Sequence, residues 1–230
     1  MSQALQCDDC PVRDSAACAA LSQEQRSEFA KIGRHHNFAA GAKIFDAGDD
    51  NRQCATLISG LLKVTQRSAD GTERIVSFIH PAGFVGELFA PSSHFEIAAL
   101  TEAQLCLFGR SEYENALKLW PDMALSLLQR SVNETTVARE MAALLGRRNA
   151  KSRIAALLLI MADAAANRPC DRADIIDLPL TREEIAALLG LTIETISRQF
   201  GAMEKDGLIL RETPRRIRLV DPQRLTELIE

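Results

Sequence analysis

Cysteines gather at one end of the chain, at spacings that suit metal or redox chemistry. Cys7, Cys10 and Cys18 form a Cys-x2-Cys-x7-Cys pattern. The other three cysteines are scattered: Cys54, Cys106 and Cys170. In a reducing compartment, clustered cysteines bind metal or do redox chemistry more often than they form structural disulfides. The pattern therefore predicts a metal or redox site in the N-terminal segment.

The cysteine pattern alone leaves metal binding and redox chemistry open. Cysteine thiolates suit a tetrahedral zinc ion. The pair Cys7-x2-Cys10 by itself also has the spacing of a redox dithiol. Cys54 and Cys170 are expected to be inert, because an isolated cysteine often behaves as a small buried apolar residue.

Residues 180–200 have the pattern of two short helices joined by a turn. Thr181 is placed to cap the first helix, with Glu184 completing a capping box, and Thr192 to cap the second. Gly190 between them is typical of a helix end with left-handed backbone. The apolar residues that would bury the two helices against each other are Ile185, Leu188, Leu189, Ile196, Phe200 and Met203.

The outer face of the second of these helices carries side chains that can read DNA bases. Arg198 suits guanine O6 and N7, Glu194 can accept from cytosine N4, and Ser197 can take either role. We predict a DNA-contacting set of Thr181, Thr192, Glu194, Ser197 and Arg198. The alternative is an ordinary helical hairpin with an exposed Glu–Arg pair.

The composition indicates a folded protein without a strong electrostatic preference. Apolar residues make up 47% of the 230 residues, enough for real cores. Residues 1–146 carry 13 Lys/Arg against 18 Asp/Glu, and residues 147–230 carry 14 against 13, so charge leaves DNA binding undecided. No apolar run is long enough to span a membrane and the start does not resemble a signal peptide. We therefore expect a cytoplasmic protein without membrane contact.

No residue pattern indicates an enzyme. The chain shows no nucleophile elbow, phosphate loop or paired catalytic carboxylates. A cupin-like metal enzyme on the β-rich part would need clustered histidines and a carboxylate on strands. The four histidines, at 35, 36, 80 and 94, show no such spacing. We therefore expect a binding protein with no catalytic residues.

The residue pattern changes along the chain, and the predicted secondary structure must position the cysteines and the DNA-contacting residues. Between 37 and 110, short apolar runs are separated by turn residues, which is typical of a small β-barrel or roll. Asp70-Gly71 indicates a hairpin within it. Helices are predicted over 22–33, 121–145, 150–166 and 181–206, and strands over 208–210 and 216–220. In these last strands Arg215 or Arg216 would contact phosphate.

These features together resemble the Crp/Fnr superfamily of transcription regulators over nearly the whole chain. The resemblance is specific in residues 83–88, Gly-Phe-Val-Gly-Glu-Leu, and in Glu194, Ser197 and Arg198, which match the Glu-x-x-Ser-Arg pattern of the Fnr branch. It implies an α+β fold with an N-terminal cyclic-nucleotide-binding-like β-roll, a long dimerisation helix and a C-terminal winged helix-turn-helix. The implied domains are a cluster-binding segment 1–20, a sensor roll 21–120, a dimerisation helix 121–146 and a DNA-binding domain 147–230.

The resemblance also implies a cofactor and partners. Cys7, Cys10 and Cys18 are similar to the N-terminal iron–sulfur motif of one Fnr subgroup, and Cys106 lies near where that family supplies its distant fourth ligand, with Cys54 as the rival. This implies a [4Fe–4S] cluster that stabilises a homodimer, whose loss to oxygen releases DNA. The implied partners are a second copy of the chain, double-stranded DNA with TTGAT-like half-sites, and RNA polymerase.

Phe95 and Glu96 stand where cyclic-nucleotide receptors of the superfamily have an Arg-Ser phosphate clamp. A carboxylate repels a phosphate, and a phenyl ring supplies no donor. We therefore expect no cyclic nucleotide, with Gly86-Glu87 kept for the structure of the roll. The rival function is a regulator of the same fold that responds to another small effector or to thiol redox, with zinc or no metal at the cysteines.

The helix over 121–145 is predicted to form the homodimer interface. On one approximate face the apolar residues recur at three- and four-residue steps, as in a coiled coil: Met123, Leu127, Val137, Met141 and Leu144. The alternative is a helix that packs only on its own roll. The largely polar stretch 130–136 interrupts the seam, and the marginal dimer that results is one that a small free energy can switch.

Overall fold

The structure is a computed structural model that describes four stretches of the chain: 7–67, 73–146, 149–165 and 173–229. The chain divides into two compact units, residues 1–138 and 139–230. The division falls inside the long helix α3 (Pro121–Leu145), so that helix begins in the first unit and ends in the second. Among the described residues, no helix is long and apolar enough to cross a bilayer.

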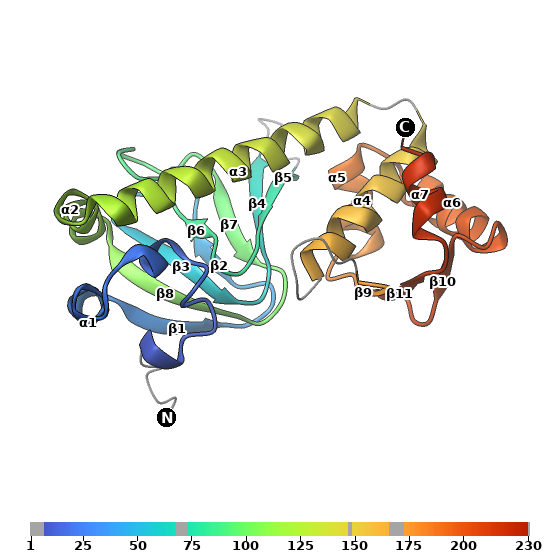
Figure 1. Cartoon of the computed structure of the whole chain (residues 1–230). Helices are drawn as coiled ribbons and strands as arrows, with labels where there is room; N and C mark the ends of the chain where they lie inside the picture. The colour runs from blue at the N-terminus through green and yellow to red at the C-terminus, as the bar shows by residue number, and fades with distance from the viewer. Residues whose placement is uncertain (1–6, 68–72, 147–148, 166–172, 230) are drawn as a thin grey trace. The chain divides into compact units, whose positions relative to one another are not determined.

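The first unit is built on two four-stranded antiparallel sheets, in the orders β1-β8-β3-β6 and β2-β7-β4-β5 (Figure 1). Their strands are β1 (Arg34–Phe38), β2 (Lys43–Phe45), β3 (Gln53–Ser59), β4 (Leu62–Arg67), β5 (Glu73–Ile79), β6 (Phe84–Val85), β7 (Glu96–Ala99) and β8 (Ala103–Gly109). The predicted β-roll over 37–110 is therefore confirmed. The predicted hairpin joins β4 to β5, and its turn at Asp70-Gly71 lies outside the described residues.

The roll has a different core on each face of its first sheet, because side chains alternate between the two faces of a strand. Along β8, Leu105 belongs to the inner core, which it shares with Leu57 and Val85. Its neighbours Cys106 and Phe108 belong to the outer face instead, where they meet the N-terminal segment and the helices. The period of the strand therefore decides which cysteine can reach that segment.

The N-terminal segment and α1 cover this outer face. Two short 3-10 turns, η1 (Cys7–Asp9) and η2 (Ala17–Ala20), precede α1 (Gln23–Ile32). Ser22 caps α1 through a capping box with Gln25, which fixes where the helix begins. Figure 1 shows this blue segment beside β1 and β8.

Two helices complete the first unit, α2 (Arg110–Leu119) and the first part of α3. Tyr113 of α2 lies against the rings of Phe29 and Phe108, at centroid distances of 5.7 and 5.3 Å. Met123 and Leu127 of α3 pack into the same core and are 0% and 9% exposed. The prediction that these two residues face a partner chain is wrong, because the roll itself buries them.

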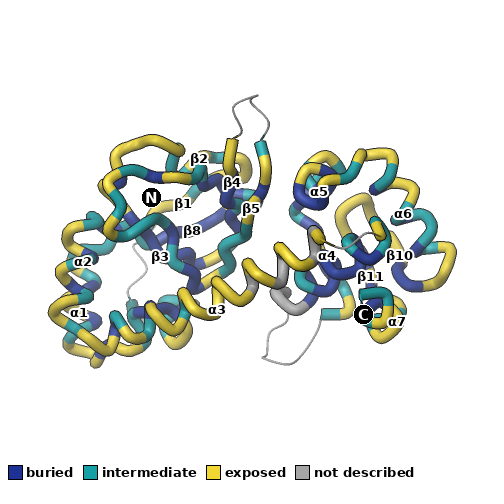
Figure 2. Tube along the Cα trace, turned by 90° about the horizontal axis from the view of Figure 1, so that it is seen from above, coloured by how far each residue is buried: buried dark blue, intermediate teal, exposed yellow. Residues whose placement is uncertain are grey.

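The opposite face of α3 carries exposed apolar side chains instead. Leu125, Leu128 and Val132 are 55%, 59% and 58% exposed, at steps of three and four residues. Figure 2 shows much of α3 coloured as exposed. Val137, Met141 and Leu144, the remaining predicted seam residues, have side chains outside the described part of the structure.

The second unit has the order of a winged helix-turn-helix. Its elements are α4 (Ala150–Ala165), β9 (Ile175–Asp177), α5 (Arg182–Leu189), α6 (Ile193–Lys205), β10 (Ile209–Arg211), β11 (Arg216–Leu219) and α7 (Pro222–Glu227). The three strands form one antiparallel sheet in the order β10-β11-β9. The predicted helices and the two final strands are confirmed within one to three residues, whereas α7 was not predicted.

Candidate cysteine site and DNA-binding surface

The structure brings four cysteines together around one cavity of about 660 Å³. Cys7 and Cys10 come from η1 and the turn after it, Cys18 from η2, and Cys106 from the middle of β8. These are the four residues that the resemblance suggested as ligands. Three short-range positions and one distant position therefore face a common space.

Turns and an apolar cluster position the three N-terminal cysteines. The Arg13 amide donates to the Cys10 carbonyl at 3.0 Å, and the Leu21 amide donates to the Cys18 carbonyl at 3.2 Å. Cys10, Cys18 and Cys106 all pack against one small group of buried residues: Val12, Ala16, Ile58 and Ala82. Because that group joins the N-terminal segment to the roll, it places the segment's thiols over the strand that carries Cys106.

Strand pairing and a glycine position Cys106. It is opposite His35 of β1 and Thr56 of β3, in the centre of the sheet. Gly33, just before β1, passes close to it. A Cβ at Gly33 would lie 3.0 Å from the Cys106 Sγ and 2.8 Å from the Phe108 ring. The missing side chain at position 33 therefore leaves room beside the thiol.

Cys54 lies on the same outer face but does not line the cavity. It is 1% exposed, inside the core formed with Phe29, Phe108 and Tyr113. Gly86 passes over it so closely that a Cβ there would lie 3.3 Å from the Cys54 Cβ. Cys54 therefore has the setting of an inert buried thiol. Cys170 lies outside the described residues.

Burial and the neighbouring thiols raise the pKa of Cys18 and of Cys106, so these two thiols favour the protonated form in the absence of a cation. Burial first, and then the neighbouring Cys7, Cys18 and Cys10, raise the pKa of Cys106 to about 12. The pKa of Cys18 is raised to about 11 by burial and by Cys10 and Cys7, while the Arg26 guanidinium acts in the opposite direction. Gathering four thiolates here therefore requires a positively charged group among them.

The cavity is larger than a single metal ion needs. A tetrahedral zinc ion holds its thiolates at about 2.3 Å, so the sulfurs stand roughly 4 Å apart. Among the described residues, no group of three or more His, Cys, Asp or Glu side chains has the arrangement to hold one metal ion. The four cysteines border one space, and four thiolates are also the ligand set of a [4Fe–4S] cluster.

In the second unit, the helix pair is fixed by the predicted caps. The Thr181 hydroxyl accepts from the Glu184 amide at 3.1 Å, and the Glu184 carboxylate accepts from the Thr181 amide at 2.8 Å. Thr192 caps α6 by accepting from the Thr195 amide at 3.3 Å. Gly190 between the helices has φ 61° and ψ 41°, the left-handed conformation that the sequence indicated.

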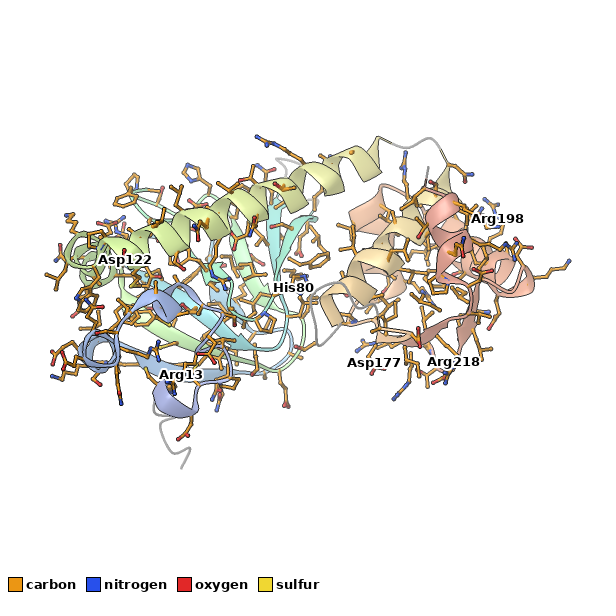
Figure 3. The ribbon with its side chains drawn as sticks, in the orientation of Figure 1. Arg13, His80, Asp122, Asp177, Arg198 and Arg218 are labelled. Atoms are coloured by element: carbon orange, nitrogen blue, oxygen red, sulfur yellow. The ribbon has the colours of Figure 1, made fainter. Side chains whose placement is uncertain are left out.

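The caps and core leave the predicted base-reading side chains free to face outwards. Ile196, Phe200 and Met203 are fully buried on one side of α6. Thr192, Glu194, Ser197 and Arg198 are exposed near its N-terminal end, where Figure 3 labels Arg198. Thr181 is half-buried, and its hydroxyl is engaged in the cap of α5.

The wing beside these helices carries arginines that are held by acidic neighbours. Arg211 pairs with Glu204 of α6 at 2.5 Å. Glu212 accepts from Arg218 at 2.5 Å and lies 3.3 Å from the Arg216 Nε. The wing therefore presents cations to its surroundings only in part, since its own carboxylates neutralise several of them.

The side chains at the expected cyclic-nucleotide position of the roll contact other residues of the protein. The Glu87 carboxylate bonds to the His94 ring at 2.6 Å. Glu96 lies 2.8 Å from the Lys43 ammonium, and Phe95 packs on the inner core. That no cyclic nucleotide binds here stays a prediction.

Two family models match the chain, one on each unit. A cyclic nucleotide-binding domain matches residues 35–119, and a Crp-like helix-turn-helix domain matches residues 152–228. The transcriptional activator protein FnrL of Cereibacter sphaeroides is 36% identical over 224 residues, which are 96% of this chain and 90% of that protein. The chain belongs to the Crp/Fnr family of transcription regulators.

Other Crp/Fnr proteins agree with this assignment. The nitrogen fixation regulation protein FixK of Bradyrhizobium diazoefficiens is 31% identical over 208 residues, covering 88% of this chain and 85% of that protein. The solved structure of FixK2 from Bradyrhizobium japonicum matches with a TM-score of 0.78 at 26% identity, over 86% of this chain and 98% of that one. The predicted α+β fold of a β-roll, a long helix and a winged helix-turn-helix is thereby confirmed.

Three features of this Crp/Fnr protein were not found from its sequence. The exposed apolar face of α3 was missed because the buried face has the same helical period. Gly33 gave no signal, because its role depends on a distant strand. Arg26 was not singled out, yet it is buried at the cysteine cavity. The place of Arg26 on the inward side of the predicted helix, beside Phe29, would have been the available signal.

Proposed function

We propose that this protein is a transcription activator that responds to oxygen or redox state through a [4Fe–4S] cluster held by Cys7, Cys10, Cys18 and Cys106. A relative in Shewanella oneidensis is called electron transport regulator A, and one in Vibrio cholerae is called fumarate and nitrate reduction regulatory protein. With FnrL, these names support a regulator of redox metabolism. Bound in this cavity, the cluster would supply an oxygen-sensitive group.

The observation that carries the proposal is the single cavity lined by those four thiols. Nothing in the spacing of the N-terminal cysteines requires them to meet a fourth from the centre of β8. The outward side chains of that strand place Cys106 there, and the period of the strand excludes its neighbours. A cavity lined by four thiols and bordered by arginines fits an iron–sulfur cluster, which carries negative charge when bound by thiolates.

The core beneath the cysteines offers a route from the cluster to the dimer. Cys18 and Cys106 pack against the same buried group that holds Met123 and Leu127 of α3. Movement of the cysteine-bearing segment therefore changes the support under this helix. We propose that the opposite face of α3, with Leu125, Leu128 and Val132, forms the homodimer seam.

Two copies joined along α3 would present two helix-turn-helix units to double-stranded DNA. Glu194, Ser197 and Arg198 suit a G·C pair flanked by A·T pairs, and this supports half-sites of the TTGAT type. A dimer would contact two half-sites about one helical turn apart. As an activator it would also contact RNA polymerase.

The experiment is anaerobic reconstitution of the full chain with iron and sulfide, followed by counts of both. Replace Cys106 by Ser, and Cys54 by Ser as the matched control. We expect about four irons and four sulfides in the wild type, little in Cys106→Ser, and full content in Cys54→Ser. Full iron in Cys106→Ser with loss in Cys54→Ser would move the fourth ligand to Cys54.

The size of the cavity favours one second candidate, a regulator that binds a small organic effector at the same place. Its volume of about 660 Å³ is within the range of ligand pockets, and Phe29, Ile58 and Phe108 give it apolar walls. Anaerobically purified wild-type protein without iron or acid-labile sulfide, even after reconstitution, would favour this candidate.

A further inference from the structure

Arg26 is a charged side chain buried at the wall of the cysteine cavity. It belongs to α1, is 9% exposed and lines the same space as Cys7, Cys10 and Cys18. Taking a guanidinium out of water is costly unless hydrogen bonds and an opposite charge compensate. The burial of the Arg26 guanidinium therefore needs a physical explanation, whereas an exposed arginine on a helix would need none.

The hydrogen bonds of Arg26 account for only part of its donors. Its Nη2 donates to the Ala19 carbonyl at 3.4 Å and to the Leu21 carbonyl at 3.2 Å. Both carbonyls belong to the short turn that carries Cys18, so the arginine ties this turn to α1. Its Nε is also buried but has no hydrogen-bond partner within the described residues.

The cavity contains an obvious opposite charge once the thiols are ionised. Arg26 lines this cavity together with the four cysteines, and its two hydrogen bonds hold it against the turn that carries Cys18. A buried cation acts more strongly than one in solvent, because little water screens it. Arg26 is therefore placed to interact with whatever negative group the four cysteines form.

We propose that Arg26 is the positioning residue of the cysteine site, which balances the negative charge of the thiolate-bound cluster and holds the Cys18 turn in place. This inference rests on the proposed function. Cluster potentials depend on net charge, on hydrogen bonds to the sulfurs and on solvent exposure. Removal of a buried cation disfavours the more negative, reduced state, so the midpoint potential falls.

The test compares full-length wild-type protein with Arg26→Gln and Arg26→Lys after anaerobic reconstitution. The matched control is Arg34→Gln, because Arg34 lines the same cavity but is exposed. Three quantities are measured: iron per subunit, the midpoint potential of the cluster, and the thermal unfolding of the apo-protein. The thermal unfolding of the apo-protein separates a general role of Arg26 in folding from a role at the cluster.

We expect the midpoint potential of Arg26→Gln to shift to more negative values and its cluster to be lost to a chelator several times faster. Arg26→Lys should keep the potential near the wild-type value but lose iron faster than the wild type, because it keeps the charge and shortens the reach to the two carbonyls. Arg34→Gln should change the potential less than Arg26→Gln.

Two results would overturn the proposal. One is a wild-type potential and wild-type iron retention in Arg26→Gln. The other is a fall in potential in Arg26→Lys as large as in Arg26→Gln, because charge would then be irrelevant. If Arg26→Gln does not fold, the proposal is tested by Arg26→Lys alone. Wild-type iron retention in Arg26→Lys would then contradict the role of Arg26 in holding the Cys18 turn. A wild-type protein that takes up no cluster would refute the proposed function itself, before Arg26 is tested.

Discussion

Gly33 leaves space beside the Cys106 thiol, and the loss of that space is a direct test of the site at the scale of one residue. A methyl group there would approach the Phe108 ring to 2.8 Å and the Cys106 Sγ to 3.0 Å. Because the ring is in a packed core, overpacking of this kind costs about 1–3 kcal/mol. We expect Gly33→Ala to lower both the free energy of unfolding and the iron content of the reconstituted protein.

A glycine with open surroundings provides the matched control for that substitution. Gly201 lies in α6, and a Cβ there would meet nothing within 4 Å. Gly201→Ala should raise the free energy of unfolding by about 0.5–1 kcal/mol through helix propensity and leave iron content unchanged. Equal iron in wild type and Gly33→Ala would show that the space beside Cys106 is not part of the site.

Arg198 gives the residue-scale test of DNA reading. It is exposed on α6, whose other side is fixed by Ile196 and Phe200. Loss of a bidentate contact to guanine should cost about 1–3 kcal/mol per half-site and relax preference at that base pair alone. Binding of Arg198→Ala to single-base variants of a two-half-site operator measures this. A uniform loss across all variants would mean that Arg198 contacts only the backbone.

Among the elements, the exposed apolar face of α3 has a proposed role in dimerisation that a substitution can test. Leu128 and Val132 are exposed in the single chain, and a Glu buried in an apolar seam is strongly unfavourable. We expect Val132→Glu to give monomers in sedimentation at concentrations where the wild type is a dimer. Asn133→Glu is the control, because position 133 lies about 100° around the helix from the seam. A dimeric Val132→Glu would place the interface elsewhere.

The wing is the second element with a prediction of its own. Glu212 holds Arg216 and Arg218, so its carboxylate competes with DNA phosphates for both. Exposed ion pairs are worth at most about 1 kcal/mol, so Glu212→Gln should tighten binding to all sequences by about two- to fivefold per half-site, more at low salt. Glu227→Gln, exposed on α7, removes the same charge away from the wing. Weaker or unchanged binding in Glu212→Gln would argue against this competition.

How much the sequence predicted differs between elements, for physical reasons. The caps Thr181 and Thr192 and the turn at Gly190 are local signals, so the helix pair could be placed from them within a few residues. The face of α3 could not be chosen, because Met123 with Leu127 and Leu125 with Leu128 have similar helical periods and only the folded roll shows which pair it covers.

The cysteine site lies between these two cases. The N-terminal pattern indicated metal or redox chemistry, but the choice of Cys106 over Cys54 depended on family resemblance. In the structure both cysteines lie on the outer face of one sheet, and the difference between them is their place along it. Such a difference depends on where a distant segment packs, which local residue patterns do not contain.

The whole molecule contains a cysteine site, a long helix that we propose for dimerisation, and a helix-turn-helix. Cys18 and Cys106 share a core with the buried side of α3, and in the proposed function a change at the site would alter the support of this helix. A switch between dimer and monomer needs a difference of only a few kcal/mol in stability, which binding of a ligand to one state can supply. The activity should therefore follow the cluster and not the chain alone.

The most direct test of this central claim follows cluster absorbance and DNA binding in the same sample as air is admitted. The account predicts that anaerobically reconstituted wild-type protein is a dimer and binds an operator with two TTGAT-like half-sites. On exposure to air, the visible absorbance and the binding should be lost together, and Cys106→Ser should bind weakly from the start. Equal operator affinity in the reconstituted, air-treated and Cys106→Ser proteins would contradict the account.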